Sequence, residues 1–268
     1  MKWFWKRKRT ALQMEMEVLR QKATSLFVHL QYMRDDEEAE LNALYETTIG
    51  RYEYEKFNAE IVSWRLNEEI KLVQIFINRH EPIDQQMIDE EINVALQRYQ
   101  MELKEREDKI TAAKAYMDAP RMTVTQTQEL RTLFRIATKA LHPDLNATVN
   151  PYMQELFVTA VSAYREGDID TLRHIVRMIS EGKEEQLSRQ EIMHLMEEAR
   201  ASITIFQEKI DKMNARFPFT FREKLKDRDW VVEKQESLKE EIAALETKNT
   251  ELHTYLTLLK QWKPDSLN

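Results

Sequence analysis

The residues best placed to do chemistry in this 268-residue chain are His142-Pro143-Asp144 and the cations that precede them. The cations stand four residues apart, at Arg131, Arg135 and Lys139. On a helix this spacing puts them on one face, and a positive face attracts a negatively charged partner and sets its orientation. Pro143 would end the helix, because proline lacks an N–H and biases the residue before it away from helical angles. The sequence therefore predicts a basic ridge that leads into an abrupt turn.

Residue patterns typical of enzymes and metal sites are missing from the sequence. It contains no cysteine, no Gly-rich phosphate loop and no serine elbow. Carboxylates stand in runs such as Glu197-Glu198, which look like solvated helix faces and not like a desolvated catalytic pair. No metal-binding spacing such as His-Glu-x-x-His joins the other histidines, which are His29, His80, His174, His194 and His253. We therefore expect that the protein is not an enzyme and takes no metal and no cofactor.

Apolar residues on both sides of the tripeptide predict the two helices that position it. Between Gln128 and the tripeptide they recur at helical spacing, at Leu130, Leu133, Phe134, Ala137 and Leu141. After a polar loop over 145–151 a second helix is expected to begin near Tyr152, and its inward residues are Leu156, Phe157, Ala160, Val161 and Tyr164. The two helices can close as an antiparallel pair with the turn exposed at the tip.

This order of features resembles the J-domain of DnaJ-type co-chaperones. In that family a helix with a basic outer face ends in His-Pro-Asp, and a second helix that carries a Phe and an Ala-Tyr pair packs back along it. The matching positions here are Arg131, Arg135, Lys139, His142-Pro143-Asp144, Phe157 and Ala163-Tyr164. The core of a J-like module over residues 121–182 would consist of Leu133, Phe134, Leu141, Phe157 and Tyr164.

The resemblance implies that His142-Pro143-Asp144 engages a DnaK-type ATPase chaperone, and that the basic face steers the module onto an acidic surface of that partner. ATP hydrolysis would take place in the partner. The resemblance covers only the middle of the chain. The segment before Gln128 lacks the Tyr-Tyr and Leu-Gly signature of the family's first short helix. The chain also lacks the family's Gly/Phe-rich linker and Cys-rich zinc module.

Composition predicts an all-α protein. The chain has 3 glycines and 6 prolines, too few for a loop-rich β fold or a phosphate-cradling α/β enzyme. The absence of cysteine excludes disulfides and fits a reducing compartment. A formal net charge of −7 gives no general drive toward nucleic acid. No apolar run approaches the length that crosses a bilayer, so we expect a cytoplasmic protein.

The first nine residues form a separate segment that places Trp3, Phe4 and Trp5 before four basic residues. In one interpretation it is a weak anchor, because aromatic rings favour the level of the lipid headgroups and basic residues favour anionic lipid. This would place the protein at a membrane surface through residues 2–9. In the other interpretation it is a tail whose aromatic residues pack on a neighbouring helix.

Heptad seams on both sides of the J-like module predict coiled-coil arms in an elongated helical bundle. The N-terminal arms span 10–118, and a C-terminal coiled-coil hairpin is predicted over 186–262. The clearest seams are Leu12, Met16, Leu19, Ala23, Leu26, Leu30 and Met33, and then Ile192, Met196, Ala199, Ile203, Phe206, Ile210 and Met213. Capping boxes are expected before the last two helices, from Ser188 with Glu191 and from Thr220 with Glu223. Asn249 occupies a seam position, where one polar residue fixes register and partner number.

Two hypotheses for the function follow from these patterns. The first is a J-domain-like co-chaperone or adaptor that recruits and stimulates a DnaK-type ATPase through the tripeptide, while the arms set its location or choose what is delivered. The alternative is a non-catalytic coiled-coil scaffold or tether in which the J-like pair is only a folded tip. In either case the seams pair between chains, as in a homo-oligomer, or they close on one another within the chain.

Overall fold

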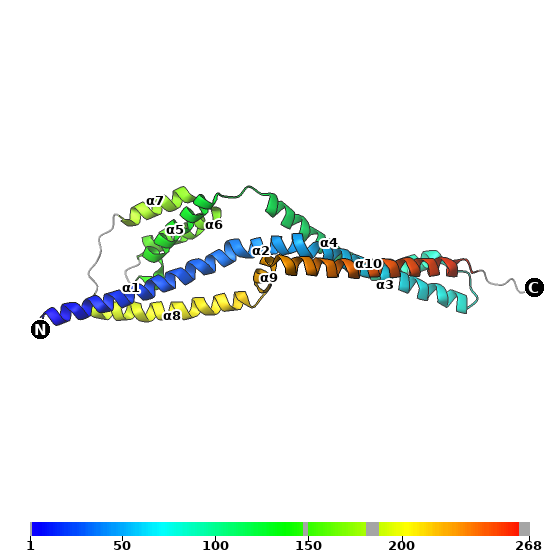
Figure 1. Cartoon of the computed structure of the whole chain (residues 1–268), viewed down its shortest axis with the longest axis horizontal. Coiled ribbons are helices and arrows are strands. Elements are labelled where there is room, and N and C mark those ends of the chain that lie inside the picture. The colour runs from blue at the N-terminus through cyan, green and yellow to red at the C-terminus, as the bar shows by residue number, and fades with distance from the viewer. Residues whose placement is uncertain (1, 147–149, 181–187, 263–268) are drawn as a thin grey trace, which may run out of the picture. The chain divides into compact units, whose positions relative to one another are not determined.

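The computed structural model describes residues 2–146, 150–180 and 188–262, and for residues 2–10 and 180 it describes the backbone alone. This part of the chain is helical and contains no strand, so the predicted all-α class is confirmed (Figure 1). Contacts between the helices divide the chain into two compact units. Unit 1 combines Met1–Glu40 with Pro120–Thr220, and unit 2 combines Leu41–Ala119 with Phe221–Asn268.

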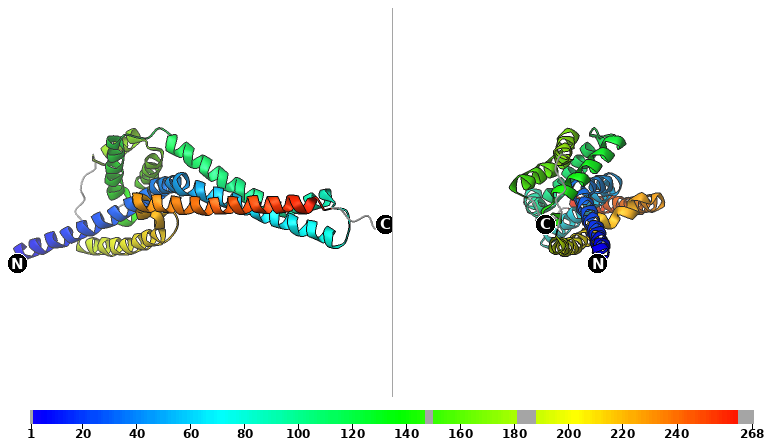
Figure 2. Two further views of the ribbon diagram at one scale, coloured as in Figure 1. Left: turned by 45° about the vertical axis from the view of Figure 1, so that its right-hand side comes forward. Right: turned by 90° about the vertical axis from the view of Figure 1, so that its left-hand side faces the viewer.

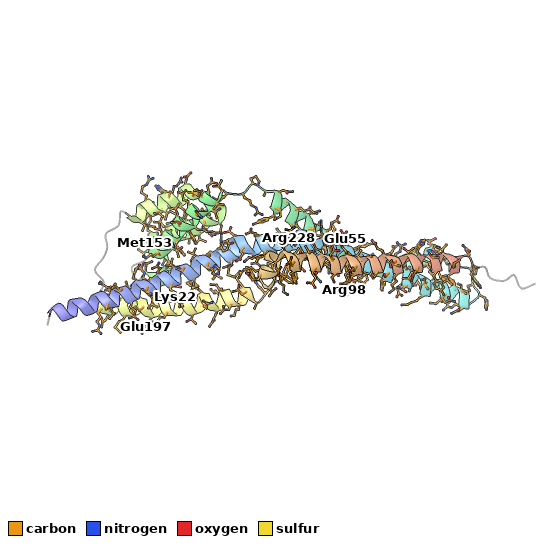
Figure 3. The ribbon with its side chains drawn as sticks, viewed as in Figure 1. Lys22, Glu55, Arg98, Met153, Glu197 and Arg228 are labelled. Carbon is orange, nitrogen blue, oxygen red and sulfur yellow. The ribbon has the colours of Figure 1, made fainter. Side chains whose placement is uncertain are left out.

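Unit 1 contains a parallel pair of long helices, α1 (Lys2–Tyr32) and α8 (Arg189–Asn214), which lie side by side (Figure 2). Residue numbers rise together along the contact, which joins Met16 to Ile192, Ala23 to Ala199 and Phe27 to Phe206. Charged neighbours of these residues stay exposed, as Figure 3 shows for Lys22 on α1 and Glu197 on α8. The seams predicted for these two helices therefore close on each other within the chain.

Unit 1 also contains the region 121–182 predicted as a J-like module, whose described helices are α5 (Val124–Leu141), α6 (Pro151–Glu166) and α7 (Ile169–Ser180). The three helices contact one another, and α5 also contacts α1. Between α5 and α6 lies the 3₁₀ turn η3 (Pro143–Leu145), which contacts both α1 and α8. Gly167 ends α6 with a φ of 71°, a left-handed conformation that costs glycine little.

Unit 2 is built from α3 (Arg51–Asn78), α4 (Gln85–Asp118) and α10 (Arg228–Lys260). The helices α3 and α10 run parallel, because Lys56 pairs with Glu241 and, further along both helices, Glu69 pairs with Lys260. The helix α4 runs antiparallel to α3, with contacts of Trp64 with Tyr99 and of Phe57 with Arg106. Their shared core includes Leu66, Val73, Ile88, Ile92 and Leu256.

The helical backbone continues from α1 to α3 through two π-helical turns. These are η1 (Met33–Glu37) and η2 (Glu46–Gly50), with α2 (Glu38–Tyr45) between them. A π turn inserts one extra residue into the helix and so rotates the faces of the flanking segments relative to a regular helix. Gly50 is buried in the second turn, where a Cβ atom would overlap the Glu46 carboxylate unless that side chain moved.

One of the two predicted capping boxes is confirmed and the other is wrong. At the start of α8, Glu191 N donates to Ser188 Oγ at 3.3 Å, and Ser188 N donates to Glu191 Oε2 at 2.6 Å. The predicted box of Thr220 with Glu223 gives way to a 3₁₀ turn, η4 (Phe219–Phe221), and a short helix, α9 (Arg222–Lys226). Asp227 then caps α10 by accepting from Asp229 N at 3.0 Å and from Trp230 N at 3.2 Å. Aspartate is the stronger N-cap residue, which accounts for the later start.

The pairing of the long helices differs from the expected domain plan. The prediction for 186–262 was a coiled-coil hairpin, whereas α8 packs along α1 and α10 packs along α3. The predicted region 10–118 is divided between the two units at Glu40. A heptad seam indicates that a helix has a partner, but several seams of similar apolar composition do not say which partner it has.

Candidate functional site

The candidate site lies where α5 ends and the chain turns toward α6. A capping box of Thr123 and Gln126 starts α5, and His142 ends it with φ −62° and ψ 125°. This extended conformation is the one favoured before a proline. Asp144 N donates to His142 Nδ1 at 3.2 Å, and Leu145 N donates to the His142 carbonyl oxygen at 3.0 Å. These two bonds close the tripeptide into a single tight turn.

The helices α5 and α6 pack as the predicted antiparallel pair. Phe134 stacks on Tyr164 at one end, with ring centroids 4.3 Å apart and planes at 18°, and His142 lies 5.0 Å from Phe157 at the other end. Among the residues assigned to the module core, Phe134, Leu141 and Tyr164 are buried, and Leu133 and Phe157 are half-buried.

His142 is buried, with only 6% of its surface exposed. Its ring meets Phe27 of α1 edge-on at 4.7 Å between centroids, and Phe206 of α8 lies 5.9 Å away. Burial lowers the pKa of the His142 imidazole, and the nearby Asp144 carboxylate partly opposes this shift. The prediction that the turn is exposed at the tip is therefore wrong for His142. The reason is that α1 and α8, which come from distant parts of the sequence, cover it.

The other two residues of the tripeptide are exposed. Pro143 and Asp144 lie on the open side of the turn, next to the buried imidazole. Asp144 therefore keeps its carboxylate accessible, while its backbone N–H is used inside the turn. The tripeptide thus has a covered face that contains His142 and an open face that contains Asp144.

The cations of α5 lie in different surroundings. The guanidinium of Arg131 lies 4.2 Å from the ring centroid of Tyr32 on α1, Lys139 pairs with Glu17 on α1, and Arg135 is exposed. A step of four residues turns the helix by about 40° beyond a full turn, so Lys139 lies about 80° around α5 from Arg131. The predicted ridge is therefore spread around the helix, and α1 engages its two ends.

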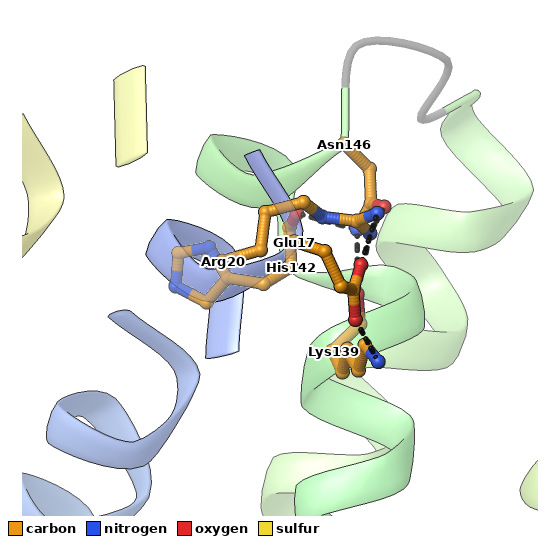
Figure 4. A network of polar contacts seen from close by, with 5 residues as sticks. All are labelled: Glu17, Arg20, Lys139, His142 and Asn146. Atoms are coloured by element: carbon orange, nitrogen blue, oxygen red, sulfur yellow. Dashed lines mark hydrogen bonds and ion pairs between the residues drawn. The ribbon is translucent and has the colours of Figure 1, made fainter. Parts of the chain in front are cut away.

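A polar network joins α1 to the end of α5 (Figure 4). Arg20 of α1 donates to the Lys139 carbonyl oxygen at 3.0 Å and to Asn146 Oδ1. Asn146 Nδ2 donates to the carbonyl oxygens of Lys139 at 3.2 Å and His142 at 3.1 Å. The last carbonyls of a helix lack partners within it, and a cation at this end interacts favourably with the helix dipole. Arg20 therefore caps α5 from outside the module, although burial lowers its pKa against the opposing effect of Glu17.

A second polar contact joins α6 to the π-helical turn η1. Tyr164 Oη donates to Asp36 Oδ2 at 3.2 Å, and Arg165 Nε donates to Asp35 Oδ2 at 3.3 Å. Burial raises the pKa of the Tyr164 hydroxyl, so this group keeps the proton that it donates. The contact holds the module against the N-terminal helix at the end of α6 that lies away from the tripeptide.

Comparison of the chain with protein-family models, curated proteins and solved structures finds no match. The resemblance to the J-domain therefore stays a prediction from the residues between Gln128 and Tyr164. Among the described residues, no group of three or more His, Cys, Asp or Glu could hold a metal ion. No helix in the described part of the chain has the length and apolar character needed to span a bilayer. The predicted contact of residues 2–9 with a membrane surface concerns side chains outside the described residues.

The sequence patterns did not assign the residues of α1 that cover the tip to the candidate site. Phe206 belongs to a predicted seam, but Phe27 stands beside the seam position Leu26 and was assigned no partner. A large apolar residue that flanks a seam widens the apolar stripe of the helix and indicates a second neighbour. Phe27 is therefore the signal that could have predicted a helix packed over the tripeptide.

Proposed function

We propose that this chain is a J-domain-like co-chaperone or adaptor, which recruits a DnaK-type ATPase chaperone and stimulates its ATP hydrolysis. The observation that carries the proposal is the tip of the α5–α6 pair, where Pro143 and Asp144 are exposed and Arg135 is exposed about two helical turns before them. The second helix supports this tip through Phe157, which contacts His142, and its Tyr164 stacks on Phe134 at the other end of the pair. The chemistry of hydrolysis belongs to the partner, and this chain supplies binding and orientation.

Charge and rigidity explain how such a tip would act. Arg135 attracts an acidic surface and speeds the encounter, with a dependence on salt concentration. Asp144 offers a carboxylate at a turn whose geometry is set by Pro143 and by the bond from Asp144 N to His142 Nδ1. A carboxylate that enters a charge-assisted hydrogen bond with the partner contributes more than a neutral group at the same place.

The test is single-turnover ATP hydrolysis by a cognate DnaK-type chaperone with and without this chain. Asp144→Asn is expected to lower the stimulation roughly tenfold or more, because a hydrogen bond to a charged group is typically worth about 1.5–3 kcal/mol. Glu155→Gln is the matched control, since Glu155 is an exposed carboxylate of α6 outside the turn, and it should leave stimulation unchanged. If neither the wild-type chain nor a variant that uncovers His142 stimulates hydrolysis, the proposal is refuted.

The coiled-coil scaffold remains a second candidate because a specific observation favours it. His142 and Lys139 are both engaged by helices of this chain, through Phe27 and Glu17 respectively. In that function the tripeptide is an internal docking element that attaches the module to α1 and α8. It predicts that Asp144→Asn and Glu155→Gln behave alike in every binding assay, while substitution of His142 lowers the stability of unit 1.

A further inference from the structure

We propose that α1 and α8 hold the J-like module in an autoinhibited state, in which a partner chaperone reaches His142 only after the module separates from these two helices. The inference rests on the proposed function, because it concerns access to the same tripeptide. It adds a form of regulation that is built into the chain. The contacts of Phe27, Phe206, Glu17 and Arg20 with the tip are called the autoinhibitory contact below.

The apolar part of the autoinhibitory contact is centred on one side chain of α1. The Phe27 ring lies 4.7 Å from His142, 5.8 Å from Phe157, 6.3 Å from Phe134 and 5.4 Å from Phe206, measured between centroids. Phe27 thus touches both helices of the J-like pair and also α8. Among the described contacts of the His142 ring with aromatic rings, only the one with Phe157 lies within the module. Separation from α1 and α8 would therefore expose the imidazole on the sides that Phe27 and Phe206 now cover.

The polar part of the contact engages Lys139, one of the three cations that the resemblance to the J-domain places on the partner-binding face. Glu17 pairs with Lys139, and Arg20 caps the end of α5 through the Lys139 carbonyl oxygen. Glu17 therefore supplies to Lys139 the negative charge that an acidic partner surface would otherwise supply. The covered state thus competes with partner binding by charge as well as by shape.

The ion pair of Glu17 with Lys139 is the part of the contact suited to opening because it is exposed to solvent, whereas the Arg20 side chain is only 16% exposed. The side chains of Glu17 and Lys139 are 42% and 45% exposed, and ion pairs at this exposure are weak and replaceable by a competing charge. The helices α5, α6 and α7 contact one another, so they can separate from α1 and α8 as one body.

The first experiment weakens the contact without changing the core. Glu17→Lys replaces the attraction to Lys139 with repulsion, and the matched control is Glu15→Lys, which makes the same charge change on α1 but affects the ion pair of Glu15 with Arg200 on α8. Exposure of His142 is measured as its rate of modification by diethyl pyrocarbonate at pH 7, read by mass spectrometry. Glu17→Lys is expected to raise this rate, and the stimulation of the DnaK-type ATPase, roughly two- to fivefold. Glu15→Lys should change neither.

The second experiment pins the module in the covered state. Asp35→Cys with Arg165→Cys places two thiols at the contact between η1 and α6, away from the tripeptide. The chain has no other cysteine, so a short bismaleimide reacts only there. The cross-linked protein is expected to show slower modification of His142 and less stimulation than the same protein before cross-linking. Each single-cysteine variant treated with the reagent is the control, and circular dichroism verifies that every form is folded.

The outcomes separate the two proposals. The autoinhibitory contact is refuted if His142 of the wild-type chain reacts as fast as His194, whose side chain is 65% exposed, or if cross-linking leaves both readouts unchanged. If His142 reactivity rises in Glu17→Lys and falls on cross-linking while no form stimulates hydrolysis, the contact stands and the proposed function fails. If both readouts change together, both proposals are supported.

Discussion

His142 shows how burial alters the chemistry of a single side chain. Its imidazole lies among Phe27, Phe157 and Phe206, where a positive charge would lose hydration with little compensation. The facing group that opposes this effect is the Asp144 carboxylate, which favours the protonated ring. Burial is the larger influence, so the pKa of His142 is lowered and the covered state favours the neutral imidazole.

The lowered pKa predicts a loss of stability in mild acid. The unfolded chain binds a proton near the ordinary value of 6.5, whereas the folded chain binds it only at lower pH. Between these two values the unfolded state carries more protons, so the free energy of unfolding falls as the pH falls, and it is unaffected by His142 well above pH 6.5. We expect a larger decrease of the urea midpoint between pH 7.5 and pH 5.5 for the wild-type chain than for His142→Gln. Equal decreases in the two proteins would contradict the prediction, because all other titrating groups are shared.

The parallel pair of α3 and α10 contains one polar residue in its seam, and that residue hydrogen-bonds across the pair. Asn249 stands in the seam of α10, and its Nδ2 donates to the Ala59 carbonyl oxygen at 2.9 Å. The hydroxyl of Ser63, which is buried, donates to Asn249 Oδ1. The polar seam residue therefore finds both of its partners on α3, and these bonds are satisfied in one register only. This agrees with the role expected for a single asparagine in a seam.

Removal of one partner of the hydrogen bond between Ser63 and Asn249 should lower the free energy of unfolding more than removal of both partners. Asn249→Ala leaves the Ser63 hydroxyl buried without its acceptor, and we expect a loss of about 1–3 kcal/mol in the free energy of unfolding. Asn249→Leu combined with Ser63→Ala is expected to recover most of this loss, because two apolar groups replace the polar pair. Urea denaturation of the variants measures both values, and Thr250→Ala, at an exposed neighbouring position, is the control. A double variant less stable than Asn249→Ala would contradict the interpretation that the loss comes from the unpaired Ser63 hydroxyl.

At the scale of the whole molecule, each compact unit uses helices from both halves of the sequence. Unit 1 needs α8 to cover the apolar face of α1, and unit 2 needs α10 to cover the apolar face of α3. Neither half of the chain therefore contains a complete core. Folding must bring together residues more than a hundred positions apart, as Phe27 and Phe206 are.

A chain divided at residue 119 tests this organisation. Fragments 1–119 and 120–268 are expected to copurify as a 1:1 complex when they are produced together, because each unit requires both. Each fragment alone should lose cooperative unfolding, since its long helices expose apolar seams. The control is fragment 1–220, which contains all of unit 1 and should keep His142 protected from diethyl pyrocarbonate. Cooperative unfolding of fragment 1–119 by itself would contradict the prediction.

Local interactions let the sequence predict the helices and the geometry of the turn. The all-α class, the stop at Pro143, the cap at Ser188 and the antiparallel pairing of the two helices beside the tripeptide all depend on residues a few positions apart or on one short connection. Where two local signals competed, as at Thr220 and Asp227, the stronger cap decided the helix start and the prediction failed.

The sequence by itself thus determined which residues are helical and where the tripeptide stands, because helix spacing and capping act between near neighbours. Only the tertiary structure decided that α1 pairs with α8, that α3 pairs with α10 and that His142 is covered. The physical reason is that the seams are similar in apolar content, so the choice among partners depends on the packing of whole helices. The same packing places Phe27 and Glu17 against the tip, so His142 is covered in a turn that the sequence predicts to be exposed.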